Sequence, residues 1–190
     1  MPKVSKSALT PKLRFPEFRN DREWEQRILG DEGEFLSPLT GKSAEHFGVG
    51  EAKYITYMNV LSNTFADMNS LGTVDVRDYE RQNRILRGDV LFTVSSETPD
   101  EAGMSSVVLE ERDACYLNSF CTLFRFFEHK RPNSRYIGYF LRQPTVRKYL
   151  SERAQGSTRY NLSKAAFRSL PILVPSPAAQ QKIAECLSTL

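Results

Sequence analysis

The sequence predicts an α+β fold: one globular domain with a mixed or antiparallel sheet, and helices near its C-terminal end. Short segments rich in β-branched and aromatic residues recur up to residue 127, and helical periodicity appears only after residue 133. The 190 residues are 40% hydrophobic and 26% charged, which is the composition of an ordinary globular domain. Strands that precede helices in this way are typical of the α+β class.

The strands are expected where apolar residues cluster between polar turns. A Gly-Asp turn at residues 88–89 is predicted to lead into a buried strand that ends at Val94. Ser106–Leu109 and Ala114–Leu117 are predicted to pair with each other around an acidic turn. The other predicted strands are residues 24–29, 53–61, 73–76, 120–127 and 172–174. Residues 1–10 are expected to form a flexible arm, and three aromatic side chains are expected to anchor the next segment to the core: Phe15, Phe18 and Trp24.

Two helices are predicted after residue 133. Ser134 is a suitable N-cap for the first helix, and Pro144 separates it from the second. Gly156 readily takes positive φ values and is predicted to stop the second helix. The side chains expected to face inward are Tyr136, Ile137, Phe140, Leu141, Val146, Tyr149, Leu150 and Ala154.

A further helix is predicted to begin at residue 176, with Ser176 as its N-cap and Pro177 in its first position. Four apolar side chains recur in it at the spacing of a helix–helix seam: Ile183, Cys186, Leu187 and Leu190. We therefore expect the globular domain to span residues 11–175. Residues 176–190 are expected to be the truncated start of a helix that contacts another helix, as in a coiled coil.

Composition also bears on the cellular compartment. No segment approaches the ~20 apolar residues that a membrane-spanning helix requires, and the N-terminus lacks the apolar core of a secretory signal. The three cysteines, Cys115, Cys121 and Cys186, are odd in number and lack a metal-binding spacing. We expect a cytoplasmic protein that does not contact a membrane.

The charge of the chain is unevenly distributed. The net charge is +3, yet residues 130–170 contain ten basic residues and one acidic residue, which leaves −6 on the rest of the chain. Such a basic block is typical of a polyanion-binding surface. The alternative is a solvated helix face that happens to be basic.

A search for catalytic residues predicts none. His46 and His129 have no triad spacing around them, and no Cys/His cluster suggests a metal site. Residues 40–43 read Thr-Gly-Lys-Ser, but Leu36 occupies the place of the leading glycine of a phosphate-binding loop. Asp100 and Glu110–Glu111 offer the carboxylates of a metal-dependent nuclease, although Arg112 replaces the expected lysine. This nuclease remains an alternative.

The residue types of the 156–164 loop favour DNA binding. Arginine reads guanine and asparagine reads adenine in the major groove, while hydroxyl and cationic groups hold phosphates. The predicted DNA-binding residues are Lys53, Thr56, Ser95, Ser96, Arg147, Lys148, Ser157, Thr158, Arg159, Tyr160, Asn161 and Lys164. A basic protein-interaction module remains a second alternative.

Several segments, in order, resemble the specificity subunit of type I restriction–modification systems. Residues 11–18 with Trp24 resemble the start of such subunits, and residues 86–91 resemble their Gly-Asp turn and strand. Residues 156–163, 170–172 and 175–183 resemble the end of their target recognition domain. Residues 179–184 resemble the start of their conserved helix, with Ala179 where an acid is usual.

This resemblance implies a target recognition domain that reads one half of a split site in double-stranded DNA. It implies a non-catalytic chain without a cofactor or metal of its own. The expected partners are methyltransferase subunits that use S-adenosylmethionine, and a restriction subunit that uses ATP and Mg²⁺. A second specificity half, joined through helix pairing, is a further expected partner.

Overall fold

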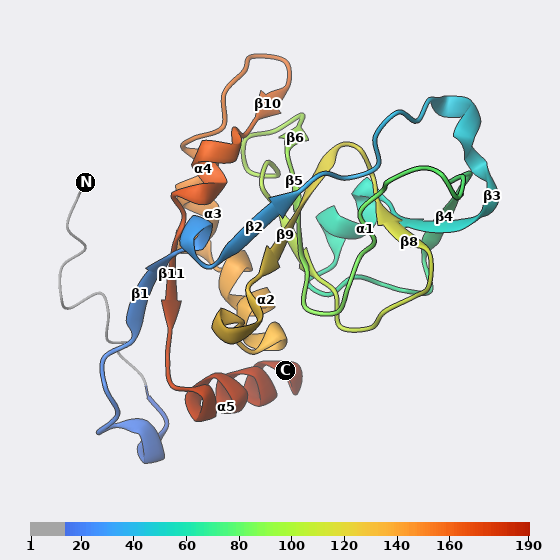
Figure 1. The fold of residues 1–190 in the computed structure, drawn as a ribbon. Helices are drawn as coiled ribbons and strands as arrows, with labels where there is room; N and C mark the ends of the chain where they lie inside the picture. Colours follow the sequence, from blue (N-terminus) through green and yellow to red (C-terminus); the bar gives the residue numbers. More distant parts are fainter. Residues whose placement is uncertain (1–13) are drawn as a thin grey trace.

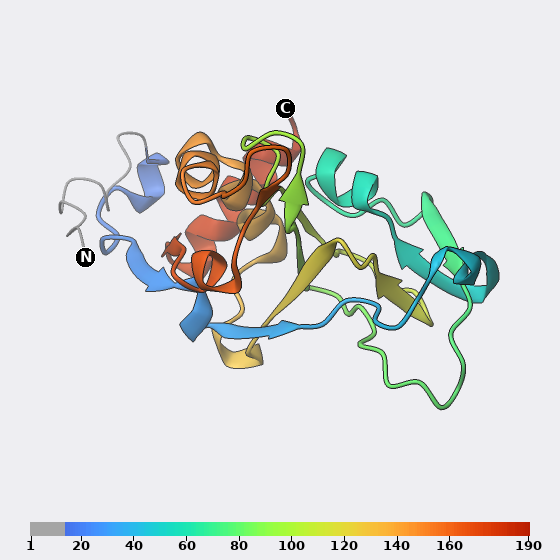
Figure 2. The same ribbon diagram turned by 90° about the horizontal axis from the view of Figure 1, so that it is seen from above.

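A computed structural model describes residues 14–190, so the arm predicted for residues 1–10 lies outside the described residues. Figure 1 shows a central sheet with helices on one side, a smaller sheet with a short helix at one end, and a two-stranded sheet at the other end; Figure 2 shows these two ends from above. The fold is thus α+β, as predicted. No helix in the described part of the chain combines the length and apolar character needed to cross a membrane.

The central sheet has four antiparallel strands in the order β2-β9-β5-β7. Their bounds are Gly33–Leu36, Cys121–Phe126, Val90–Thr93 and Ser105–Val107. Alternate residues of a strand face opposite sides of a sheet. Phe92 and Phe124 accordingly join the larger core cluster, while Leu91 and Leu123 join a second one. Because both faces are buried, β5 and β9 are mostly apolar, and the charged exception is the half-buried Arg125 of β9.

Helices α2 (Ser134–Arg142), α3 (Pro144–Ser151) and α4 (Lys164–Arg168) contribute to the larger cluster. The inward residues predicted for α2 and α3 are confirmed, with Tyr149 only partly buried, except that Ala154, also partly buried, lies beyond the end of α3. The predicted cap was wrong by one residue, because the Asn133 side chain accepts the hydrogen bonds at the start of α2. α3 begins at Pro144 as predicted.

The smaller sheet has the order β4-β3-β8, with bounds Leu71–Val74, Phe47–Ile55 and Cys115–Leu117. The strand predicted for residues 53–61 is wrong in its second half. Thr56 Oγ1 accepts a hydrogen bond from the Asn59 N–H (3.1 Å) and starts helix α1, Tyr57–Ser62. The predicted pairing of the β7 and β8 segments is also wrong, because β7 pairs with β5 and β8 pairs in parallel with β3.

At the other end, β1 (Glu25–Ile28) pairs antiparallel with β11 (Pro171–Val174), and α5 (Pro177–Ser188) follows. Ser176 caps α5 as predicted. The buried side chain of Gln180 attaches this helix to α2. Its Oε1 accepts a hydrogen bond from the Asn133 N–H (2.7 Å), and its Nε2 donates one to the Pro175 carbonyl (2.9 Å).

The outer face of α5 differs in one residue from the predicted seam. Ile183 is partly buried against its own domain, so less of its side chain is exposed than at the other seam positions. Cys186, Leu187 and Leu190 are exposed, and Leu190 is 97% accessible. Three of the four seam residues therefore remain on the surface.

Candidate nucleic-acid interface

Two segments predicted to bind DNA lie side by side. β6 (Ser95–Ser96) pairs antiparallel with β10 (Tyr160–Asn161), so that Tyr160 lies opposite Ser96 and Asn161 opposite Ser95. Figure 1 shows this pair beyond the end of the central sheet, close to α4. The Leu162 N–H donates to the Val94 carbonyl (2.9 Å) and continues the contact. The two segments therefore form one paired edge, on which Asn161 lies opposite Ser95, while Ser96 is buried.

The turn that presents Arg159 is closed by two backbone hydrogen bonds. The Gln155 N–H donates to the Asn161 carbonyl (2.9 Å), and the Asn161 N–H donates to the Gln155 carbonyl (2.8 Å). Gly156 has φ of +140°, and a β-carbon there would collide with the Arg159 carbonyl. Because α3 already ends at Ser151, Gly156 shapes this turn and does not stop the helix as predicted. Ser157, Thr158 and Arg159 are exposed on it.

A groove of about 470 Å³ lies beside this turn. The hydroxyl of Tyr57, on α1, donates to the Ser95 carbonyl (2.8 Å), and Ser96 Oγ donates to Glu101 Oε2 (2.8 Å). These contacts connect α1, β6 and the loop after β6. The groove is lined by Tyr57, Met58, Leu61, Ser95, Ser96, Glu97, Glu101, Phe120 and Arg159.

Only Ser95, Ser96 and Arg159 of this lining were predicted as site residues. Phe120 was assigned to a buried strand, but it precedes β9 and is 58% exposed. The neighbouring Asn118–Ser119 pair was the available signal, because polar turn residues indicate that the strand starts later. Met58 was missed because the helix α1 was not predicted.

Arg147, predicted to contact DNA, instead holds the loop that borders the groove. Its guanidinium donates to the carbonyls of Gly103 (2.6 Å), Ala102 (2.6 Å) and Asp100 (2.9 Å). Burial lowers the pKa of the Arg147 side chain. Because its donors are used within the protein, Arg147 positions the 100–103 loop.

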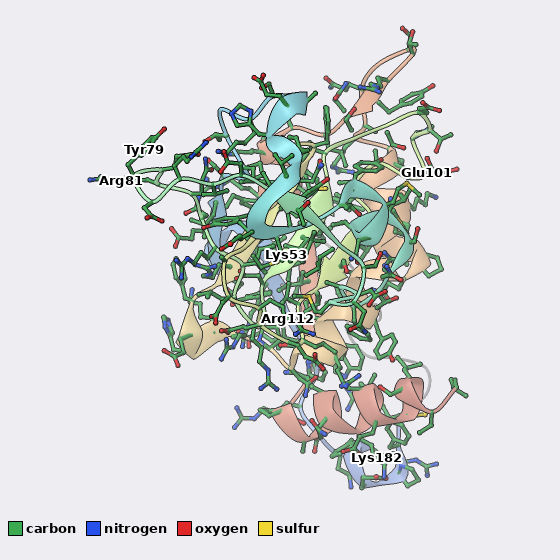
Figure 3. The ribbon with its side chains drawn as sticks, turned by 90° about the vertical axis from the view of Figure 1, so that its right-hand side faces the viewer. Lys53, Tyr79, Arg81, Glu101, Arg112 and Lys182 are labelled. Atoms are coloured by element: carbon green, nitrogen blue, oxygen red, sulfur yellow. The ribbon has the colours of Figure 1, made fainter. Side chains whose placement is uncertain are left out.

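The other predicted residues do not line the groove. Lys53 lies on β3 between Thr73 and Cys115, and Figure 3 shows it well away from Glu101. Thr56 caps α1. Lys148 forms an ion pair with Glu152 (3.8 Å) on the surface of α3. Lys164 is the exposed first residue of α4, and Tyr160 is half-buried against the core.

The basic block of residues 130–170 is not one surface. Arg142 donates to four backbone carbonyls, those of Val60, Leu61, Asn63 and Ser105, at 2.7–3.0 Å. Burial lowers the pKa of the Arg142 side chain to about 10. Within residues 14–190, three members of the block make no hydrogen bond, ion pair or cation–π contact through their side chains: Arg159, Lys164 and Arg168.

The nuclease and the phosphate-binding loop, two possibilities raised by the sequence, gain no geometric support from residues 14–190. Glu111 accepts a hydrogen bond from the Arg87 N–H (2.8 Å), whereas the Asp100 carbonyl contacts Arg147. No group of three or more potential metal ligands occurs among residues 14–190. The Lys42 amine is occupied in an ion pair with Glu80 (2.6 Å), which fits the view that residues 40–43 are not a phosphate-binding loop.

With this geometry established, comparison with known proteins identifies the family. A family model described as type I restriction modification DNA specificity domain matches residues 21–190. The chain belongs to this family. A search of curated protein sequences finds no significant match.

Similar solved structures include the type I restriction-modification S subunit from M. genitalium, with a TM-score of 0.62, and the HsdS subunit from Thermoanaerobacter tengcongensis, with a TM-score of 0.58. A third structure, of the type I R-M system, concerns complex assembly and conformational transition and has a TM-score of 0.59. Each is 15% identical to this chain and covers 94–96% of it. The chain spans about two-fifths of their length, 40–41%.

Proposed function

We propose that this chain reads one half of a split site in double-stranded DNA. The supporting observation is the pairing of β6 with β10, which places Asn161 opposite the half-buried Ser95 and brings the exposed side chains of Arg159 and Asn161 next to β6. Arginine suits the O6 and N7 acceptors of guanine, and asparagine suits the edge of adenine. Serine and threonine hydroxyls suit phosphate oxygens.

We further propose that the domain directs methyltransferase and restriction subunits to this site. The chain would contribute sequence recognition alone. A methyltransferase partner would supply S-adenosylmethionine chemistry, and a restriction partner would use ATP and Mg²⁺. The exposed side chains of Cys186 and Leu187 on α5, and of Leu190 just after it, are the proposed contact for a partner helix. We expect such an assembly to act in the cytoplasm.

DNA binding can be tested with fluorescence anisotropy on duplexes selected from a random pool. We expect one enriched sequence, and affinity that falls steeply with salt because phosphate contacts release counterions. Arg159→Ala should weaken binding to the selected duplex about tenfold, since one bidentate base contact contributes ~1–3 kcal/mol. It should change binding to an unrelated duplex much less.

Arg19→Ala is the matched control, because Arg19 is an exposed arginine next to η2 (Pro16–Phe18), and Figure 1 shows the chain segment of η2 at the opposite end of the molecule from β10. Equal losses on both duplexes would make Arg159 a phosphate contact only. A pool without any enriched sequence would instead favour the protein-interaction module. Co-expression with the methyltransferase subunit, followed by mapping of adenine methylation, tests the proposed assembly.

A further inference from the structure

We propose that Phe120, together with Met58, contacts the C5-methyl group of thymine in the major groove and so determines part of the DNA specificity. This inference rests on the proposed function and names a recognition element within it. The observation that carries it is the apolar edge of the groove that Arg159 also lines.

Both apolar side chains are exposed without a structural reason. Phe120 is 58% and Met58 is 60% accessible, whereas most large apolar side chains of this domain are buried. Exposed apolar side chains that gather at one hollow indicate an interaction site. Here they lie in one lining with polar groups of β6 and with Arg159, the residue before β10, so the surface combines apolar contact with hydrogen bonding.

The backbone holds Phe120 in a fixed position. The Phe120 N–H donates to Asn118 Oδ1 (2.9 Å), and the Val94 N–H donates to the Phe120 carbonyl (3.2 Å). Met58 is the second residue of the capped helix α1. A side chain that is already positioned loses less entropy when it binds.

The charges of the groove favour base edges over phosphates. Glu97 and Glu101 line it together with the single cation Arg159. Two carboxylates repel a phosphate group, but a carboxylate accepts well from the amino group of cytosine. A groove that combines a carboxylate, a guanidinium and apolar side chains therefore matches the exposed edges of bases, where thymine presents its methyl group.

The geometry also distinguishes this contact from intercalation. Apolar wedges that unstack DNA are inserted between base steps from the minor groove. Phe120 instead forms part of the wall of a groove, and its neighbours there are polar groups suited to base edges. We therefore assign Phe120 to a methyl contact.

The test uses the full chain and its selected duplex, with each thymine replaced in turn by deoxyuridine, which lacks only the methyl group. The wild-type protein should lose about three- to tenfold in affinity at one or two positions, the range that burial of one methyl group supports. Phe120→Ala should bind the unmodified duplex more weakly and should no longer respond to deoxyuridine at those positions. Met58→Ala is expected to show a smaller change of the same kind.

Phe127→Ala is the matched control, because Phe127 is also exposed but lies at the opposite end of β9. It should bind like the wild type and keep the deoxyuridine response. A selected site without thymine, or a wild-type protein that is indifferent to every replacement, would overturn the methyl contact while leaving DNA recognition intact. Equal deoxyuridine sensitivity in wild type and Phe120→Ala would show that another residue reads the methyl group. If the wild-type protein binds no duplex selectively, that result would instead contradict the proposed function.

Discussion

Arg125 binds the buried carboxylate of Asp89 through two hydrogen bonds, each 2.8 Å long. The same carboxylate accepts a hydrogen bond from the Leu86 N–H (2.7 Å), so it closes the turn at Gly88 and joins it to β9. The side-chain hydrogen bond with Asp89 raises the pKa of Arg125. The Gly-Asp sequence of this turn thus has a structural role, because Gly88 supplies the positive φ of +91° and Asp89 supplies the cross-strand contact.

Asp89→Ala should lower the free energy of unfolding by about 3 kcal/mol, because it leaves a partly buried guanidinium without its charge partner. Urea denaturation measures the change. Asp78→Ala removes an exposed carboxylate and should change stability by less than about 0.5 kcal/mol. Similar midpoints for the two variants would contradict a stabilising role for the Asp89–Arg125 pair.

Arg142→Lys should destabilise the domain by about 2–4 kcal/mol although the charge is kept. Lysine lacks the planar fork that reaches four carbonyls, so buried acceptors lose their donors. Thermal unfolding should show a lower melting temperature for Arg142→Lys than for the wild type. Arg135→Lys, at an exposed arginine over the Phe65 ring (5.6 Å), should shift the melting temperature far less.

The Lys42–Glu80 pair should make stability depend on acid pH. The side-chain hydrogen bond from Lys42 lowers the pKa of Glu80 to about 2, below its ordinary value of 4.5. The unfolded chain therefore takes up a proton first as the pH falls, and the contribution of this pair, complete above pH 4.5, is lost between about pH 4.5 and 2. Unfolding midpoints of wild type and Glu80→Gln should accordingly converge as the pH falls through this window. A difference in unfolding midpoint that stays constant over this pH range would contradict a stabilising role for the Lys42–Glu80 pair.

Thiol reagents should label one cysteine rapidly in the folded protein. Burial raises the pKa of Cys115 to about 11 and that of Cys121 to about 12, whereas Cys186 is exposed on α5. Since thiolate is the reactive form, Ellman's reagent at pH 8 should release about one equivalent quickly and the rest only after denaturation. Cys186→Ser should abolish the fast phase, and its persistence would mean that a buried thiol is accessible.

Local sequence signals predicted much of the fold. The apolar runs of β5, β9 and β11, and the cap and proline at the start of α5, correspond to elements that the structure contains. The errors came from single side-chain contacts and from pairing between strands that are far apart in the sequence. The Thr56 side chain caps helix α1, where a strand was expected. The choice of partner strand for β7 and β8 depends on residues far away in the chain.

The candidate site was harder to predict than the fold. Sequence selected Ser95 and Arg159 as separate DNA-binding candidates, because loops rich in hydroxyl, amide and guanidinium groups are typical of recognition surfaces, but only the structure shows that both line one groove. It also selected Arg147, whose charge is visible in the sequence but whose three carbonyl partners are not. Phe120 was overlooked for the converse reason, since an aromatic residue beside a strand is usually buried.

The two ends of the domain lie next to each other. β1 and β11 run side by side, with Glu25 opposite Val174 and Ile28 opposite Pro171. The segment between Ile28 and Pro171, which contains the groove, starts and ends at this one pair of strands, and its residue Asn133 also contacts Gln180 of α5. A replacement segment would therefore leave α5 in place if it starts and ends at the same two strands and keeps a contact for Gln180. Under the proposed function, recombination at β1 and β11 would then change the sequence preference of the domain without redesign of α5.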